Sequence, residues 1–249
     1  MSRWKAAAIH LSISAAIGLV VGALLLLVWY PPPYFHAAGA DQLVLLLVGV
    51  DLVLGPLLTL ILFRSGKKGL KFDLAMIAVL QTTALVYGLS VVLQSRPVFL
   101  VSAVDRFVLV SANEIDPEDL AKGSKPEFRS LSYTGPRVAG ARMPESTRER
   151  EKLLFSGLAG KDIERFPEYY VDYREAAAGL LRRAKPLDQL VLAGPADQDA
   201  LAAAINATGK PRAALVFVPI VARRASLTML LDAQTGAPLR AVAIYPWPD

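Results

Sequence analysis

The stretch LVLLLVGVDLVLGPLLTLILF, from Leu43 to Phe63, decides the fold of this chain. It contains a single charged residue, Asp51, close to its middle. At about 1.5 Å per residue, a helix of this length is roughly 31 Å long, which matches the hydrocarbon core of a bilayer. We therefore predict a transmembrane helix over 43–63. A carboxyl group at that depth has no water around it, so Asp51 needs a partner inside the membrane.

Two further apolar segments, 6–30 and 72–94, flank this stretch, which predicts a three-helix membrane module over residues 1–95. The first segment follows a short basic start and runs into three consecutive prolines. It is too long for a signal peptide and shows no small-x-small cleavage site, so we expect an uncleaved anchor. Trp29, Tyr30 and Tyr34 at its end predict an aromatic belt at the membrane surface.

Basic residues in the connections predict the orientation. The connection 64–71 carries four Lys or Arg residues, whereas the connection 31–42 carries none. Arg3 and Lys5 add positive charge at the N-terminus. The positive-inside rule then places the N-terminus and the second connection in the cytoplasm. We expect a multi-pass membrane protein, surrounded by membrane lipid, with residues 96–249 on the far side of the membrane, which in a bacterium is the periplasm.

The composition excludes several classes of function. The chain has a net charge of +5, but residues 96–249 carry 21 basic against 19 acidic residues, spread along the sequence. No basic stripe for nucleic acid results. The chain has no cysteine and only two histidines, His10 and His36, predicted to lie on opposite sides of the membrane. We therefore expect no metal site and no Ser–His hydrolase.

An intramembrane aspartyl protease needs two carboxyl groups that share a proton. Asp51 and Asp73 are the only candidates, and the helical rise separates them by about 15 Å in depth. The geometry argues against this pair, so we expect no catalytic residues and no enzyme.

The second half predicts an α+β domain with antiparallel strands. Residues 97–104 and 107–112 are β-branched and alternate partly, which predicts two strands. Helices are expected from 117, from the capping box Ser146-x-x-Glu149 to about 158, over 173–184 and over 197–206. Residues 123–144 read as a long exposed loop. Three strands within 214–245 predict an antiparallel meander, with Pro219 at an edge or a bulge.

Small and polar residues in the predicted helices are candidate packing or partner-binding positions. A small-xxx-small spacing lets two helices approach closely. The favoured interpretation is packing within the module, and the alternative is a helix from a partner protein. The positions with this spacing are Ser14, Gly18 and Gly22 in the first helix, and Ala84 and Gly88 in the third.

Asp51 is the centre of a predicted polar clamp. Helical depth places it level with Gln81, Thr82 and Thr83, so we expect it to be hydrogen-bonded to these residues, protonated, or both. A partner-binding or proton-linked role is an equal alternative. Gly55-Pro56 should kink the helix beside it, and His10 matches the depth of Thr59.

Aromatic residues mark a candidate contact surface in the second half. Tyr169, Tyr170 and Tyr173 cluster in sequence, and Trp247 lies between two prolines. Core filling is the favoured interpretation of the tyrosines, with a recognition surface as the alternative. Trp247 is expected either to pack or to dip into the headgroups.

Several stretches, in one order over nearly the full length, are similar to the bacterial type IV pilin accessory proteins of the TfpX/TfpZ type. They include RWKAAAIH (3–10), WYPPPYF (29–35), GVDLVLGPLLTLILF (49–63), GKKGLKFDLA (66–75), QTTALVYGL (81–89), RPVFLVSAVDRFVLVSANEID (96–116), ERFPEYYVDY (164–173), RAKPL (183–187) and FVPIVARRASLTMLLDAQTGAPL (217–239).

This resemblance implies an inner-membrane protein that assists the stability, membrane handling or pilus assembly of a type IV pilin subunit, without enzymatic activity or a cofactor. The alternative is a membrane sensor whose periplasmic domain binds a ligand. Against a sensor, the cytoplasmic face offers only a short N-terminus and one short connection for an output.

Overall fold

The structure is a computed structural model that describes residues 2–247, apart from the side chain at position 46. Within this part of the chain, three helices are long and apolar enough to cross a membrane. They begin and end within three residues of the predicted bounds, and the first continues into one π-helical turn. Their bounds are α1, Arg3–Leu24, with the π-helical turn Leu25–Trp29; α3, Ala40–Leu62; and α4, Leu70–Gln94.

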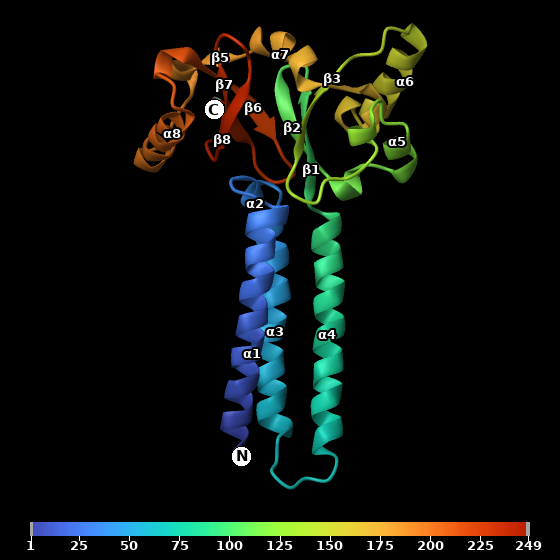
Figure 1. Ribbon diagram of the computed structural model, residues 1–249, viewed down its shortest axis with the longest axis vertical. Coiled ribbons are helices and arrows are strands. Elements are labelled where there is room, and N and C mark those ends of the chain that lie inside the picture. Colours follow the sequence, from blue (N-terminus) through green and yellow to red (C-terminus); the bar gives the residue numbers. More distant parts are fainter. Residues whose placement is uncertain (1, 248–249) are drawn as a thin grey trace.

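A domain with a mixed eight-stranded sheet follows the three helices (Figure 1). The strand order is β4-β3-β1-β2-β6-β7-β8, and β5 pairs with β6. The strands are β1, Pro97–Ala103; β2, Arg106–Ser111; β3, Arg137–Ala141; β4, Tyr170–Val171; β5, Lys185–Pro186; β6, Leu215–Val221; β7, Leu227–Asp232; and β8, Pro238–Val242.

The sheet corrects two expectations. The predicted β1–β2 hairpin and β6–β7–β8 meander are antiparallel, but β1 pairs with β3, and β2 with β6, in parallel. The sheet is therefore mixed rather than purely antiparallel. The predicted loop 123–144 contains β3, which pairs with β1 and β4. Gly140 in β3 permits this packing, since a Cβ there would come within 2.5 Å of the Ala176 side chain.

Pro219 lies in an interior strand and not at the predicted edge or bulge. It pairs with Thr228 of β7 on one side of β6. On the other side, β5 pairs with 216–217 and β2 pairs with 220–221. Residues 218 and 219 lie between these two short pairings, so position 219 needs no N–H donor on that side and the proline is tolerated inside the sheet.

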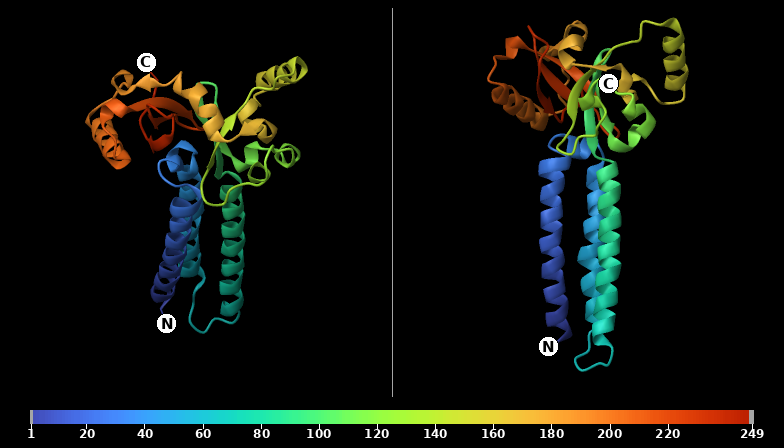
Figure 2. Two further views of the ribbon diagram at one scale, coloured as in Figure 1. Left: turned by 45° about the horizontal axis from the view of Figure 1, so that its top comes forward. Right: turned by 45° about the vertical axis from the view of Figure 1, so that its right-hand side comes forward.

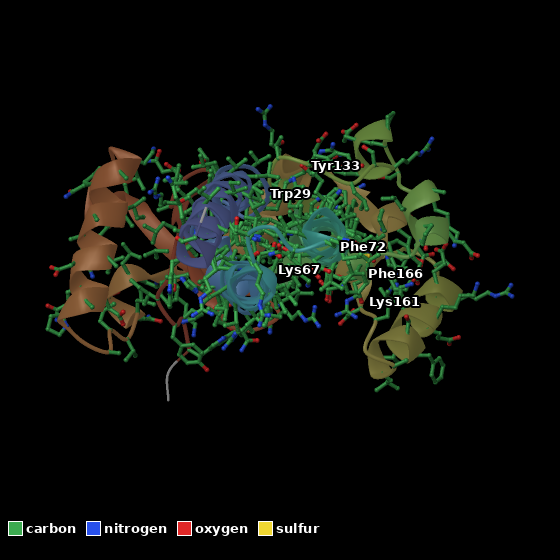
Figure 3. The ribbon with its side chains drawn as sticks, turned by 90° about the horizontal axis from the view of Figure 1, so that it is seen from below. Trp29, Lys67, Phe72, Tyr133, Lys161 and Phe166 are labelled. Atoms are coloured by element: carbon green, nitrogen blue, oxygen red, sulfur yellow. The ribbon has the colours of Figure 1, made fainter. Side chains whose placement is uncertain are left out.

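The remaining helices cover the top and both sides of the sheet (Figures 1 and 2). Seen end-on from below, the three long helices lie under the middle of the domain, with α8 to one side and α5 and α6 to the opposite side (Figure 3). These elements are α2, Tyr34–Ala37; α5, Pro117–Ala121; α6, Thr147–Leu158; α7, Tyr173–Leu181; and α8, Pro195–Thr208.

The outer end of the bundle and the sheet share one hydrophobic core. Tyr30 and Leu25 are fully buried in a cluster that also contains Phe107 and Ile220 from the sheet. The Tyr30 hydroxyl donates a hydrogen bond to the Val92 carbonyl at 2.7 Å, which ties the end of the first helix to α4. Tyr30 therefore belongs to the core and not to the expected aromatic belt.

Candidate functional site

A trough between α1 and α4 is the first candidate site in the membrane module. α3 packs against both of these helices. Two cavities of about 350 and 170 Å³ are lined by side chains from α1 and α4 together. Both cavities share His10 and Ile13 of α1 with Ala78 and Gln81 of α4, so they are adjacent. We call the two cavities together the α1–α4 trough.

A hydrogen-bonded network from all three helices forms the floor of the trough. His10 Nδ1 lies 2.6 Å from the Thr59 hydroxyl, and His10 Nε2 lies 2.7 Å from Gln81 Oε1. Gln81 Nε2 donates to the backbone carbonyl of Asp51 at 3.3 Å. A neutral imidazole satisfies this geometry, since Nε2–H donates to the amide oxygen and Nδ1 accepts from the hydroxyl. The predicted match of His10 with Thr59 is confirmed.

The Asp51 side chain takes a smaller part in the clamp than predicted. Gln81 contacts its backbone carbonyl. The buried oxygen Oδ1 has no hydrogen-bond partner in the described part of the chain. Thr82 and Thr83 are exposed, so of the predicted polar patch only Gln81 hydrogen-bonds to Asp51. An acceptor that is buried but unpaired is costly in a bilayer.

Gly55 allows α3 and α4 to meet at the network. A Cβ at this position would come within 2.1 Å of Gln81 Nε2. Glycine therefore lets the Gln81 amide reach the backbone of α3. Pro56 follows directly inside the helix, and α3 continues through it to Leu62.

The small-residue positions serve packing within the module at two places. A Cβ on Gly18 would lie 3.6 Å from Val48 of α3, and one on Gly88 would come within 2.3 Å of Leu47. Ser14 is buried and also lines the trough. A Cβ on Gly22 would meet nothing within 4 Å. Both stripes therefore contact α3, which is the favoured interpretation from the sequence. Ala84 lines a separate groove between α3 and α4.

The predicted aromatic surface of the outer domain is largely core. Tyr170 is fully buried, with its ring 5.2 Å from that of Phe99, so it cannot form part of a contact surface. Tyr173 stacks on Phe107 at 5.4 Å, and burial raises the pKa of its hydroxyl to about 12. Tyr169 is half-buried.

Trp247 is also half-buried, and the Arg106 guanidinium lies 5.3 Å from the centre of its ring. This contact agrees with the expectation that Trp247 packs.

An exposed apolar face on α6 was missed by the sequence reasoning. Leu154, Phe155 and Leu158 are 64%, 69% and 79% exposed, whereas Leu153 is buried. Consecutive apolar residues in one short helix do not reveal which of them faces the core. Lys161, just after α6, ties this end of the helix to α5 through Asp119 at 2.5 Å (Figure 3).

The described residues contain no group of three or more His, Cys, Asp or Glu side chains that could hold a metal ion. The polar atoms of the trough are an imidazole, a hydroxyl, an amide and a carboxyl, and together they suit recognition by hydrogen bonding.

The comparisons with known proteins agree on one family. The family model "Fimbrial assembly protein FimB" matches residues 1–39, which include all of α1 and α2. The chain is 31% identical to the fimbrial assembly proteins of serogroups I and E1 of Dichelobacter nodosus, over 91% of this chain and 89% of each relative. It is 33% identical to the protein of serogroups C1 and C2 of the same organism, over 47% of this chain and 90% of that relative.

No solved structure matches the chain. Both full-length matches cover most of this chain and most of the relative, including the three helices and the outer domain. The match is to the fimbrial assembly proteins rather than to the TfpX/TfpZ type specifically. The chain belongs to the fimbrial assembly protein family.

Proposed function

We propose that this chain is a non-enzymatic accessory factor of type IV pilus biogenesis, of the TfpX/TfpZ type, in the bacterial inner membrane. Its N-terminus faces the cytoplasm, and its outer domain faces the periplasm. The names of its relatives support a role in fimbrial assembly. The distribution of Lys and Arg between the two connections supports the orientation.

We further propose that a pilin subunit is the partner and that its hydrophobic helix binds in the α1–α4 trough. The observation that carries this proposal is the trough itself, which α1, α3 and α4 surround on three sides. A hydrophobic helix in lipid gains little from leaving the acyl chains, so association must come from close packing and polar contacts. The trough offers both, since Ile13 and Ala78 form apolar walls and the network lies between them.

The Asp51 carboxyl supplies the polar part of this recognition. Its unpaired Oδ1 is an acceptor at the depth of the membrane centre, and Asp51 also lines the trough. Since Asp51 lines the trough, a donor on the incoming helix at the same depth would hydrogen-bond to its carboxyl group. The proposed contact is therefore specific in depth as well as in shape.

Site-specific photocrosslinking in native membranes tests this proposal. A photoreactive residue at Ile17 or Ala78 faces the trough, whereas one at Leu19 or Leu80 is exposed elsewhere on the same helices. We expect a crosslink to the pilin subunit from the two trough positions and a much weaker one from the two control positions. Equal crosslinking from all four positions, or none from the trough, would refute the proposed contact.

A further inference from the structure

A second cavity lies where the bundle meets the outer domain, away from the α1–α4 trough. Its volume is about 590 Å³. The end of α4, the start of α3, the segment after β2 and the β6–β7 connection all contribute to its wall. The polar side chains that line it are those of Gln42, Ser95, Asn113, Arg223 and Arg224. We call this cavity the junction pocket.

The junction pocket carries an uncompensated positive charge. Arg224 donates its backbone N–H to the Ala37 carbonyl at 3.0 Å and lies 3.4 Å from Asp41. These contacts hold the β6–β7 connection against α2. The adjacent Arg223 side chain is exposed and forms no hydrogen bond or ion pair within residues 2–247. A free guanidinium on an anchored backbone suits a phosphate group, which it can bind through two N–H donors.

An apolar groove between α3 and α4 continues from the junction pocket. Leu43 and Val91 line both spaces. The groove has a volume of about 310 Å³, reaches Ala84 on α4, and has Asp51 of α3 as the one charged residue among the described residues that line it. From Val92 to Ala84, the extent of its lining on α4, the helical rise gives about 12 Å. This length is most of the roughly 15 Å that one leaflet contributes to a hydrocarbon core of about 30 Å.

We propose that an anionic phospholipid of the outer leaflet binds here. Its phosphate contacts Arg223 in the junction pocket, and one acyl chain lies in the groove between α3 and α4. A free phosphate ion would satisfy the guanidinium but would leave the apolar groove without an occupant. At the expected membrane surface, the basic pocket is followed by an apolar groove. This arrangement suits one amphiphile, with its phosphate in the pocket and its acyl chain in the groove, better than it suits a soluble anion. Of the described residues, the groove shares only Asp51 with the α1–α4 trough, and lipid binding here does not require a partner in the trough.

Lipid retention by the purified full-length chain tests the inference. The protein is reconstituted in nanodiscs with equal phosphatidylglycerol and phosphatidylcholine, extracted in mild detergent and weighed by native mass spectrometry. We expect retained phosphatidylglycerol in excess over phosphatidylcholine. Arg223→Gln should reduce that excess about fivefold, since one basic side chain near a membrane surface contributes roughly that factor. Arg240→Gln, an exposed arginine on β8, is the matched control and should change nothing.

Two further measurements separate the lipid from a simple anion. Val91→Trp fills the groove and should lower phosphatidylglycerol retention although Arg223 is intact. Excess inorganic phosphate should not displace the bound lipid. Equal retention of both lipids by the wild type, or an unchanged excess in Arg223→Gln, would overturn the inference. Full displacement by phosphate, or unchanged retention in Val91→Trp, would overturn the lipid as occupant.

Discussion

The hydrogen bond between His10 and Gln81 is expected to stabilise the bundle measurably. The two side chains lie on α1 and α4, and the contact at 2.7 Å joins these helices across the floor of the trough. Hydrogen bonds inside membrane proteins contribute about 0.6 kcal/mol on average and up to about 1.7 kcal/mol. This bond is short and partly buried, so we expect a coupling energy of about 0.6 to 1.7 kcal/mol.

A double-mutant cycle measures this coupling directly. The variants are His10→Ala, Gln81→Ala and the double variant, and the free energy of unfolding is followed in bicelles by titration with denaturing detergent. Each single variant should lose about 1–3 kcal/mol because it leaves a buried partner unpaired. The double variant should lose less than the sum of the two, since the second substitution finds the bond already absent.

Ser12 supplies the matched control for the cycle. Its hydroxyl donates to the Ala8 carbonyl of its own helix, and it is exposed. Ser12→Ala combined with Gln81→Ala should be additive within about 0.3–0.5 kcal/mol. If the His10 and Gln81 substitutions are equally additive, the network does not join α1 to α4 and the trough loses its polar floor.

Three further predictions concern the outer domain and use unfolding of the full chain in detergent. Gly140→Ala should destabilise it by about 1–3 kcal/mol, because the new methyl group meets a side chain of α7; an unchanged midpoint would contradict the β3–α7 packing. Leu153→Ala should lower the free energy of unfolding by about 2–5 kcal/mol, and Leu154→Ala by less than about 0.5 kcal/mol. Equal losses would contradict the orientation of α6, in which Leu153 faces the core and Leu154 does not. The ion pair with Lys210 and nearby N–H donors lower the pKa of Asp232. Asp232→Asn should therefore have a lower free energy of unfolding than the wild type at pH 7, and this difference should shrink as the pH falls below about 4. A difference that stays constant with pH would contradict the lowered pKa.

Depth along the helices could be predicted from the sequence, whereas rotation about their axes could not. The fixed helical rise alone predicts that His10 and Thr59 lie at the same depth. The contact of His10 with Gln81 depends on which faces of α1 and α4 turn toward α3, and a nearly uniform apolar sequence carries little information on this point. The same uncertainty explains why Thr82 and Thr83 were expected at Asp51 but are exposed instead.

Short strands and non-local pairings in the outer domain were also beyond the sequence signal. β3 reads RVAGA, and its glycine suggests a loop until the closeness of α7 is known. Parallel pairing joins strands that are far apart in sequence, so the local pattern favoured the antiparallel alternative. A capping box was expected at Ser146, but its side chain makes no capping bond, and the structure instead has one at Ser111 and Glu114.

We propose that three spanning helices place the outer domain in the periplasm. The chain has no cysteine, so a single introduced cysteine can be labelled without ambiguity. A membrane-impermeant maleimide applied to intact spheroplasts should label Arg148→Cys in the outer domain at once, and Lys67→Cys between α3 and α4 only after lysis. Labelling of Lys67→Cys in intact spheroplasts, with Arg148→Cys protected until lysis, would contradict the account.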